Sequence, residues 1–395
     1  MRSGALAGLL LAVVMPSMAN AGQYFVYAGS YTSEPSSGTP PLVNPGRPAP
    51  QPSTSQGIYG WRFDTATMAL SPLGLVAETA NPAHVWISPN GKYLYAVNWQ
   101  ENSARVPPGV SAYAIDSKSG ALKLLNKQNS AGELPNQVVV DPSGRVAATV
   151  NYKSGNLALF PIHDDGTLGE PFAVEQSEGK PISPHGDGPH AHGVVFTKDS
   201  RWMFEAELGL DRVYSYGLDI GNKKLTPLNP PYVTLPAGSG PRRLQLSPDD
   251  RFLYVNRQND GKVSVFAVDH GKLTPVQEIE TNPKDAQGRG GTAEIQIDHP
   301  GRFLYVSLRG SSTIAVYSID HATGKLTLLE DVPAQGSSPR NITISPDGDF
   351  LFAANQASDN VVIFKINHQT GHLDPLEPQM HLSQPGGIAL VSARD

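Results

Sequence analysis

Cysteine is absent from this 395-residue sequence. Without disulfides, the chain must be held together by its core and its topology alone. Long runs of like charge are also absent, and the formal net charge is −6. This balance argues against a nucleic-acid partner, because phosphate backbones require a basic face.

Long apolar runs are missing except at the N-terminus. Arg2 precedes an apolar stretch at Ala5–Val14, and Ala19-Asn20-Ala21 has the form of a signal-peptidase site. The apolar stretch is about half of the ~20 residues needed to span a membrane. We therefore predict a signal peptide at residues 1–21, a mature chain that starts near Gly22, a periplasmic or secreted location and no membrane contact after cleavage.

Glycine and proline are plentiful, with 39 and 35 residues. Together with scattered short apolar runs, they indicate many turns and short strands rather than helices. The length allows a large core.

A turn signal recurs along the chain, and an apolar, β-branched and aromatic run follows each copy. The six copies are at residues 88–91, 141–144, 198–200, 247–250, 299–301 and 345–348. A further strand follows each of these runs, and then a turn ends in leucine. The spacing of about 50 residues is near that of long propeller repeats.

The two ends of the chain supply a seventh unit. Gln23–Ser30 and Gly57–Asp64 match the second and third strands of the other units, and Pro385–Val391 matches the missing first strand. A closed ring explains this split, because joining the ends removes the open sheet edges. We predict an all-β, seven-bladed β-propeller over residues 22–395, and a pair of β-sandwiches would leave the split unit unexplained.

Two insertions interrupt the repeat. Ser33–Gln56 is rich in proline and serine and is predicted to be a flexible surface loop. Trp99–Pro108 is a shorter insertion at the equivalent place in the next unit.

Polar side chains gather where first strands begin and second strands end, and a meandering blade brings these points to one face. At the openings are His84, Asn136, Gln137, His190, His192, Arg242, Arg243, Glu294, Arg340 and Asn341, and at the tips are Tyr31, Asn98, Asn151, Glu207, Asn256, Arg257, Arg309 and Asn355. Arginine forks suit carboxylate or phosphate, so this face is predicted to bind a small anionic or polyhydroxylated ligand.

Several of these residues have a structural alternative. Asn98, Asn151 and Asn355 are expected to hold turns. Arg340 is either a ligand contact or a cap on blade carbonyls, and Glu294 is either catalytic or the partner of a neighbouring arginine.

The pair His190-x-His192 has three interpretations. A histidine is suited to general acid–base work at neutral pH, because its unperturbed pKa is about 6.5. The pair could instead bind zinc with His185 and Asp187, although no recognised zinc spacing is present. One of the two could also bond the blade backbone, and His192 is expected to be the more buried.

With these residues laid out, the chain resembles the β-propeller lactonases, the family of propeller-type 6-phosphogluconolactonases and the fungal carboxymuconate cyclase. The motifs that carry the resemblance are GSYT at Gly29–Thr32, GIYGWRFD at Gly57–Asp64, GPHAH at Gly188–His192, ELGLDRV at Glu207–Val213, GSGPRR at Gly238–Arg243, AEIQI at Ala293–Ile297, FLYVSLRG at Phe303–Gly310 and SSPRNITISPDGDFLFAAN at Ser337–Asn355.

The resemblance implies catalytic roles for His190 or His192, for Arg242 and for Arg309. The sequence departs from the family pattern in three places. Arg243 stands where the family usually has histidine, Asn256-Arg257-Gln258 stands at the tip that usually carries glutamate, and Glu207 replaces the usual aspartate.

We therefore predict a monomeric lactonase that opens a sugar-acid lactone such as 6-phosphogluconolactone, with neither cofactor nor metal. Its predicted catalytic residues are His190, His192, Arg242, Arg309, Glu207 and Glu294, and its predicted substrate contacts are Arg243, Arg257, Arg340 and His84. The alternative is an exported propeller that binds such a ligand without catalysis, which the missing glutamate favours.

Overall fold

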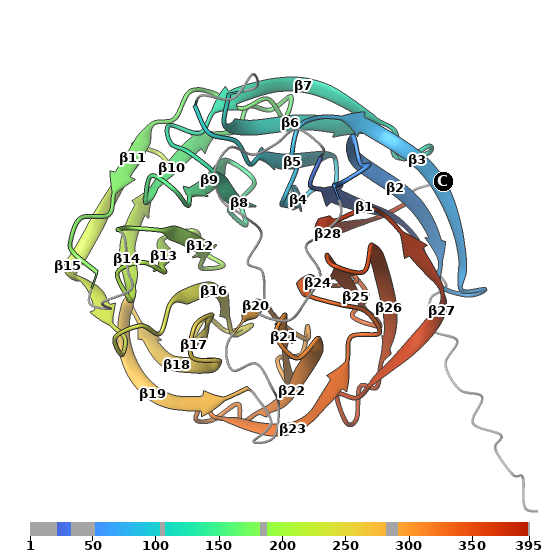
Figure 1. The fold of residues 1–395 in the computed structure, drawn as a ribbon. Helices are drawn as coiled ribbons and strands as arrows, with labels where there is room; N and C mark the ends of the chain where they lie inside the picture. The colour runs from blue at the N-terminus through green and yellow to red at the C-terminus, as the bar shows by residue number, and fades with distance from the viewer. Residues whose placement is uncertain (1–21, 33–51, 103–106, 182–187, 282–290, 394–395) are drawn as a thin grey trace, which may run out of the picture.

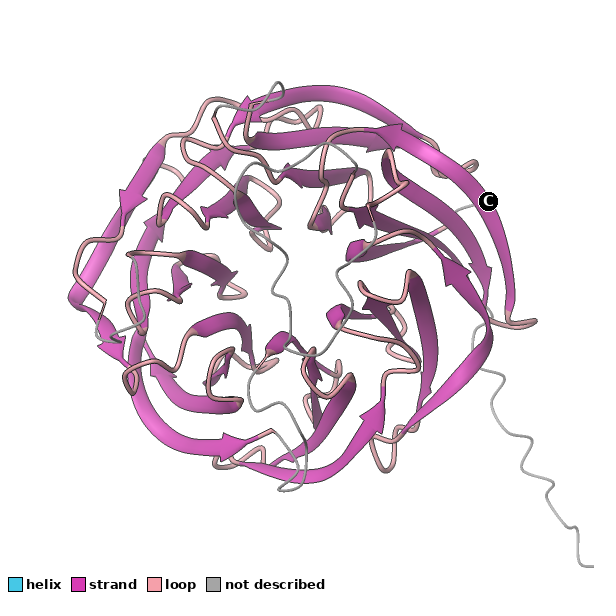
Figure 2. Cartoon of the chain, in the orientation of Figure 1, coloured by secondary structure: helices cyan, strands magenta, loops and turns pink. Residues whose placement is uncertain are grey.

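Seven antiparallel sheets of four strands each surround a central axis (Figure 1). The computed structural model describes residues 22–32, 52–102, 107–181, 188–281 and 291–393. These residues form strands joined by turns and loops (Figure 2) and include no helix long and apolar enough to cross a membrane. The predicted seven-bladed propeller is confirmed.

Each blade contributes its first strand to the axis and its fourth strand to the outer edge (Figure 1). The first strands are β28 (Pro385–Ser392), β4 (Val85–Ile87), β8 (Pro135–Val140), β12 (Ala191–Phe196), β16 (Pro241–Leu246), β20 (Thr292–Ile297) and β24 (Pro339–Ile344). The second strands are β1 (Gln23–Ser30), β5 (Tyr93–Asn98), β9 (Val146–Asn151), β13 (Trp202–Glu207), β17 (Phe252–Arg257), β21 (Phe303–Leu308) and β25 (Phe350–Asn355). The third strands are β2 (Gly57–Asp64), β6 (Gly109–Ile115), β10 (Asn156–Pro161), β14 (Arg212–Asp219), β18 (Lys262–Asp269), β22 (Thr313–Ile319) and β26 (Asn360–Ile366). The outer strands are β3 (Ala69–Glu78), β7 (Leu122–Asn129), β11 (Ala173–Gln176), β15 (Lys224–Thr234), β19 (Lys272–Glu280), β23 (Leu326–Pro333) and β27 (Leu373–His381).

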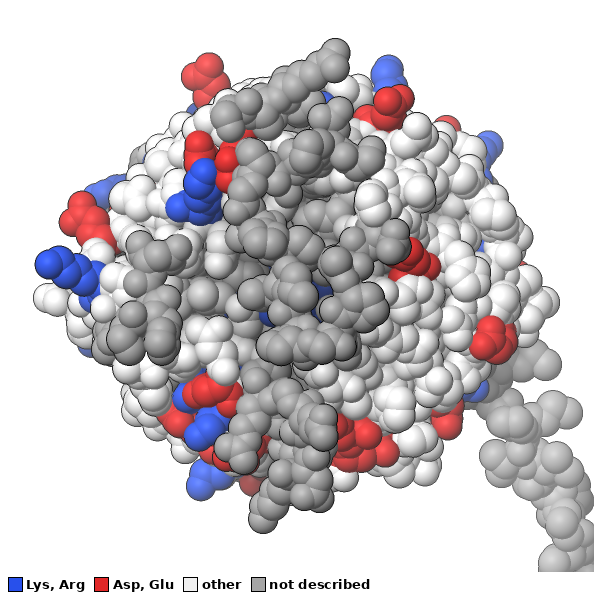
Figure 3. Space-filling view, viewed as in Figure 1, with Lys and Arg blue, Asp and Glu red and all other residues white. Residues whose placement is uncertain are grey.

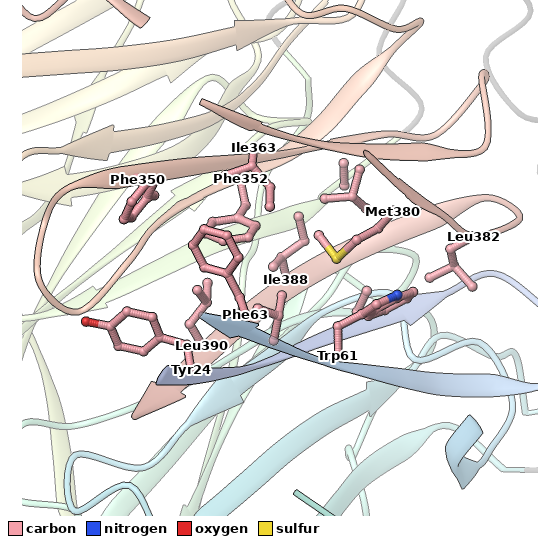
Figure 4. Close-up of a cluster of buried hydrophobic side chains, with 14 residues drawn as sticks. Tyr24, Trp61, Phe63, Phe350, Phe352, Ile363, Met380, Leu382, Ile388 and Leu390 are labelled. Atoms are coloured by element: carbon pink, nitrogen blue, oxygen red, sulfur yellow. The ribbon is translucent and has the colours of Figure 1, made fainter. Parts of the chain in front are cut away.

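The ring closes where the last strand pairs with the first. β28 runs antiparallel to β1, with Leu390 opposite Val26 and Ile388 opposite Ala28. The closing blade packs against its neighbour through a buried cluster, in which the Phe63 ring meets Phe352 edge-on at 5.7 Å between centroids (Figure 4). Apolar burial between blades thus supplies the stability that a cysteine-free chain needs.

A tyrosine hydroxyl links adjacent blades at four of the seven junctions. The hydroxyls of Tyr27, Tyr95, Tyr254 and Tyr305 donate to the carbonyls of Gly120, Gly166, Gly324 and Gly371, each in a turn of the next blade. The turn requires glycine: Gly324 has φ +71°, and a Cβ there would lie 2.3 Å from the Phe252 ring. These buried hydrogen bonds fix the spacing between blades.

Part of the predicted Ser33–Gln56 loop is packed against the ring. Residues 33–51 lie outside the described residues, but Ser53 and Ser55 are buried. Ser53 Oγ donates to the Tyr31 carbonyl at 2.5 Å, and Ser55 Oγ donates to the Ser383 carbonyl at 2.8 Å. The end of this insertion is therefore tied to the blade that closes the ring.

One carboxylate is enclosed between two blades. Glu205 of β13 has no exposed surface, and its Oε2 accepts a 2.8 Å hydrogen bond from the Tyr216 hydroxyl. Its Oε1 has no hydrogen-bond partner. Burial raises the pKa of Glu205 to about 8, and the nearby charges of Glu207 and Glu175 act in the same direction.

Closure of the ring predicts a large effect of Ile388→Ala in β28. The substitution leaves a cavity in the cluster that joins the first and last blades, so we expect it to cost about 2–5 kcal/mol of unfolding free energy. Leu329→Ala on the outer strand β23, where the side chain is 46% exposed, is the matched control and should be nearly neutral. Denaturant unfolding measures both, and equal effects would contradict a closing role for β28.

From the raised pKa of Glu205 we predict that the unfolding free energy of the protein falls as pH rises. Between the usual carboxyl pKa of 4.5 and about 8, the folded protein keeps the Glu205 proton while the unfolded chain has released it. The unfolded state then binds fewer protons, so the unfolding free energy decreases across this window. Glu205→Gln removes this dependence, and its gain in melting temperature should be larger at ~pH 9 than at ~pH 5. Glu78→Gln at an exposed site is the control, and an equal gain at both pH values would refute the assignment.

Candidate active site

The residue that follows each second strand occupies an equivalent place in all seven blades. In six blades its N–H donates to the carbonyl of the residue that precedes the first strand, as in Gln258 to Gly240 and Arg309 to Gly291, and in the second blade Trp99 N–H donates to the Asn81 carbonyl. In ring order these residues are Tyr31, Trp99, Tyr152, Leu208, Gln258, Arg309 and Gln356. Together they form the rim of the site.

A bulge lies just below the rim in six blades, where one extra residue of the first strand is inserted opposite the second strand. A bulge bends its strand and re-aims a side chain. Asn136, His192, Arg242 and Arg340 are the extra residues of four of these blades. The bulges thus place polar side chains around the axis.

The β12 blade differs in register from the β8, β16 and β24 blades, in which the leading proline of the first strand pairs with the strand tip. Ala191, rather than Pro189, pairs with the strand tip Glu207, and the His190 carbonyl accepts from the Leu208 N–H. His192 is therefore the bulge residue, whereas His190 precedes the strand at the rim. As predicted, His192 is the more buried histidine, with 4% of its surface exposed.

Arg243 crosses the floor of the site. Its Nε lies 3.3 Å from Glu294 Oε2, and its Nη1 donates to the His192 carbonyl. Asn341 Nδ2 donates to the same Glu294 oxygen at 3.0 Å. Glu294 is therefore the partner of an arginine, which was one of its two predicted roles.

Arg242 and Arg309 share a neutral acceptor. Gln258 Oε1 accepts from Arg242 Nε at 3.1 Å and from Arg309 Nη2 at 2.8 Å. Arg242 Nη1 also donates to the Ala293 carbonyl. Burial and the charge of Arg340 lower the pKa of Arg309 to about 10, so its guanidinium is still protonated at neutral pH. The sequence analysis predicted both arginines as site residues but assigned no role to Gln258.

Arg340 and His84 line the same small cavity, which Arg242, Arg243 and Glu294 also line. The Arg340 guanidinium lies 5.2 Å from the centre of the Tyr31 ring. His84 Nδ1 is buried without a hydrogen-bond partner. Burial, followed by the charges of Arg243 and Arg242, lowers the pKa of His84 well below its usual range, so the ring is neutral.

The two histidines of the GPHAH segment contact one aromatic ring. Tyr152 stacks on His190 at 4.4 Å and meets His192 edge-on at 5.7 Å. His190 Nδ1 lies 2.9 Å from the Tyr152 carbonyl oxygen. If Nδ1 carries the proton, this bond fixes the ring and puts the basic lone pair on Nε2. The sequence missed Tyr152, and its place directly after a strand tip was the available signal.

His192 has a different environment. Its ring nitrogens lie 2.8 and 3.0 Å from Asn136 Nδ2. Burial, followed by the charges of Arg242 and Arg243, lowers its pKa well below the usual range. The His192 ring is therefore neutral and takes up a proton less readily than an ordinary histidine.

Two predicted site residues serve other contacts. Glu207 accepts from the backbone N–H groups of His190 and Leu210, so it orders the backbone beside His190 rather than the imidazole. Arg257 is not in the cluster, because its guanidinium pairs with Asp260 and with Glu278 at 3.0 Å. An arginine at a strand tip can point toward the outer strands, and sequence alone does not give this direction.

The strand-tip asparagines are structural, as predicted. Asn98, Asn151 and Asn355 donate from Nδ2 to the carbonyls of Ala80, Ser130 and Ala334, which lie in the segments that lead into their blades. They hold the blade openings in place rather than facing a ligand.

The described residues contain no group of three or more side chains suited to hold a metal ion. His185 and Asp187, the predicted partners in the zinc alternative, lie outside the described residues. A larger groove at the other end of the β16 and β20 blades holds Phe252, His321 and Asp249, whose carboxylate is paired with Arg251 at 2.6 Å. The arginine cluster is therefore the candidate site.

The cluster is cationic in a chain that is acidic overall. Glu294 neutralises Arg243, whereas Arg242, Arg309 and Arg340 have no carboxylate partner among the described residues. On the visible surface of Figure 3, by contrast, acidic and basic side chains are interspersed around the rim of the disc. Positive charge is thus concentrated at the axis, as an anion-binding site requires.

A closed seven-bladed ring with arginines, histidines and amides around its axis defines a propeller with a cationic cluster at its centre. The family model described as "Lactonase, 7-bladed beta-propeller" matches residues 25–390, so the chain belongs to this family of lactonases. This confirms the resemblance and the class of hydrolase that the sequence predicted.

Individual relatives agree with this assignment. The 6-phosphogluconolactonase of Bacillus subtilis is 31% identical over 300 residues, which cover 74% of this chain and 82% of the relative. The 6-phosphogluconolactonase of Formosa agariphila is 31% identical over 295 residues, which cover 73% and 82%. The solved structure of the Pseudomonas aeruginosa periplasmic gluconolactonase is 28% identical with a TM-score of 0.84, and the match covers 94% of this chain and all of that one.

Proposed function

We propose that this protein hydrolyses a sugar-acid lactone that carries an anionic substituent, such as 6-phosphogluconolactone. The single observation that carries the proposal is the group of Arg242, Arg309 and Arg340, which have no carboxylate partner among the described residues. Arginine binds phosphate and carboxylate through paired N–H groups, and a lactone needs only a base and an oxyanion partner for hydrolysis. The names of the curated relatives support the same substrate class.

In the proposed mechanism, His190 is the general base. Its Nδ1 bond to the Tyr152 carbonyl and its stacking on the Tyr152 ring hold Nε2 in a fixed direction. Nε2 removes a proton from water as the water oxygen attacks the lactone carbonyl. The imidazolium then returns the proton to the ring oxygen as the carbon–oxygen bond breaks, which yields the open hydroxy acid.

The arginines act on charge. Arg242 and Arg309 are oriented by Gln258 and are assigned to the anionic substituent. Arg340, which lines the same cavity, is assigned to the oxyanion that develops on the carbonyl oxygen. His192 and Arg243 shape the floor through their bonds to Asn136 and Glu294. This scheme needs no cofactor.

We also propose that the protein is exported. The charged start, the apolar stretch and the Ala19-Asn20-Ala21 site support a cleaved signal peptide. The similarity to a periplasmic gluconolactonase supports the same compartment.

The assignment of the base predicts different effects for the two histidines. His190→Gln should lower kcat for lactone opening by about 10²–10⁴-fold, the usual contribution of a general base, with little change in binding of the product acid. His192→Gln should have a smaller effect on kcat because His192 is already a poor proton acceptor. His372→Gln, a surface histidine paired with Glu330, is the control. Release of acid from 6-phosphogluconolactone and gluconolactone measures all three, and a wild-type kcat in the His190 variant would overturn the mechanism.

If residues 1–21 are a signal peptide, protein recovered from the periplasm of a bacterial host should begin at Gly22. Intact-mass measurement distinguishes this from a chain that starts at Met1. A full-length chain retained in the cytoplasm would contradict export, and Ala21→Asp, which changes the cleavage site alone, should leave the precursor uncleaved.

A further inference from the structure

The side chain of Gln258 lies between two arginines of the site. It follows β17 at the rim, and its backbone is held on both sides, since its N–H donates to the Gly240 carbonyl at 2.7 Å and its carbonyl accepts from the Gly291 N–H at 2.5 Å. Its side-chain oxygen bridges Arg242 Nε and Arg309 Nη2. A fixed backbone thus sets one amide oxygen between two guanidinium groups.

The bridge leaves donors for a ligand. Arg242 Nη2 and Arg309 Nη1 make no hydrogen bond in the part of the chain that the structure describes, and neither atom is among the buried polar atoms without partners. Each guanidinium is therefore held through two of its three nitrogens, and the third has no protein acceptor among the described residues. An oxyanion with several oxygens can accept hydrogen bonds from both of these nitrogens.

The charge of the bridge decides how strongly the pair attracts an anion. A glutamine oxygen accepts hydrogen bonds without adding charge, so the unit of Arg242, Gln258 and Arg309 keeps two positive charges. A carboxylate in the same place would accept the same two bonds and cancel one of these charges. Because the unit is buried, that difference is screened much less than it would be in water.

We propose that Gln258 is a specificity-determining residue. Its neutral side chain orients Arg242 and Arg309 and preserves the positive charge of both. The site therefore selects a dianionic phosphate ester over an uncharged hydroxyl at the same point of the ligand. This inference rests on the proposed function for the identity of the ligand, but it concerns binding selectivity and not the hydrolytic step. It assigns a role to the residue that directly follows the end of β17, beside the strand tip where the family usually carries glutamate.

The test compares two stable acids, 6-phosphogluconate and gluconate, by calorimetric titration of the full chain. The wild type should bind 6-phosphogluconate more tightly. Gln258→Glu should reduce the ratio of the two dissociation constants by at least ~10-fold, because one positive charge of the unit is cancelled. The same variant should be as stable as the wild type or more stable, because two buried arginines gain a counter-charge. A residue that only supported the fold would not combine weaker phosphate selection with retained stability.

A charge series keeps the test decisive if one variant folds poorly. Arg309→Met also leaves one positive charge and should lose phosphate preference like Gln258→Glu. Gln258→Met keeps two charges and should keep the preference, even if both acids bind more weakly. Gln369→Glu adds the same negative charge at an exposed turn and should change nothing. The proposal would be overturned if Gln258→Glu and Arg309→Met both kept the preference of the wild type for 6-phosphogluconate. It would also be overturned if Gln258→Met lost that preference.

The two proposals fail in different ways. If neither lactone is hydrolysed but phosphate preference follows the charge of the unit, the proposed function is refuted and the role of Gln258 stands. If 6-phosphogluconolactone is hydrolysed but phosphate preference is the same in all variants, the role of Gln258 is refuted and the lactonase assignment stands.

Discussion

Every feature of the site depends on the pairing of β28 with β1. This one antiparallel contact converts a row of blades into a ring, because it supplies the inner strand that the first blade lacks. Residues as distant in sequence as His84 and Arg340 then line one cavity. The pairing also buries Ile388 and Leu390 among Phe63, Phe350 and Phe352, so the contact that forms the site also stabilises the ring without cystine.

The geometry of the site comes from a repeated irregularity. A single bulge near the start of the inner strand turns one side chain toward the axis in blade after blade, and the residue after each second strand completes the rim. Each blade can therefore change its contribution by changing one or two residues without altering the sheet. The aromatic rim residues Tyr31, Trp99 and Tyr152 belong to three successive blades, and Gln258 and Arg309 to two others.

The buried arginines of the site lower the stability of the folded protein, and a role in binding an anion explains why they are there. Arg242, Arg309 and Arg340 are gathered within one small site, and only Arg243 has a carboxylate partner there among the described residues. Like charges in a buried site destabilise the folded state unless a ligand or a counter-charge balances them. Neutral acceptors, chiefly Gln258 and the Ala293 carbonyl, orient the arginines and leave the balancing charge to a ligand.

The sequence by itself determined the repeat, the split first blade and hence the ring, because alternating apolar strands and turn residues are local signals that recur with a period. It also determined which blade ends carry arginine and histidine. Tertiary structure alone decided how those residues act. The register at Ala191 separated His190 from His192, the direction of the Arg257 side chain removed it from the cluster, and the contact of Gln258 with two arginines from neighbouring blades gave that residue its place. These outcomes depend on bulges, side-chain directions and contacts between blades, and a linear sequence fixes none of them until the ring is closed.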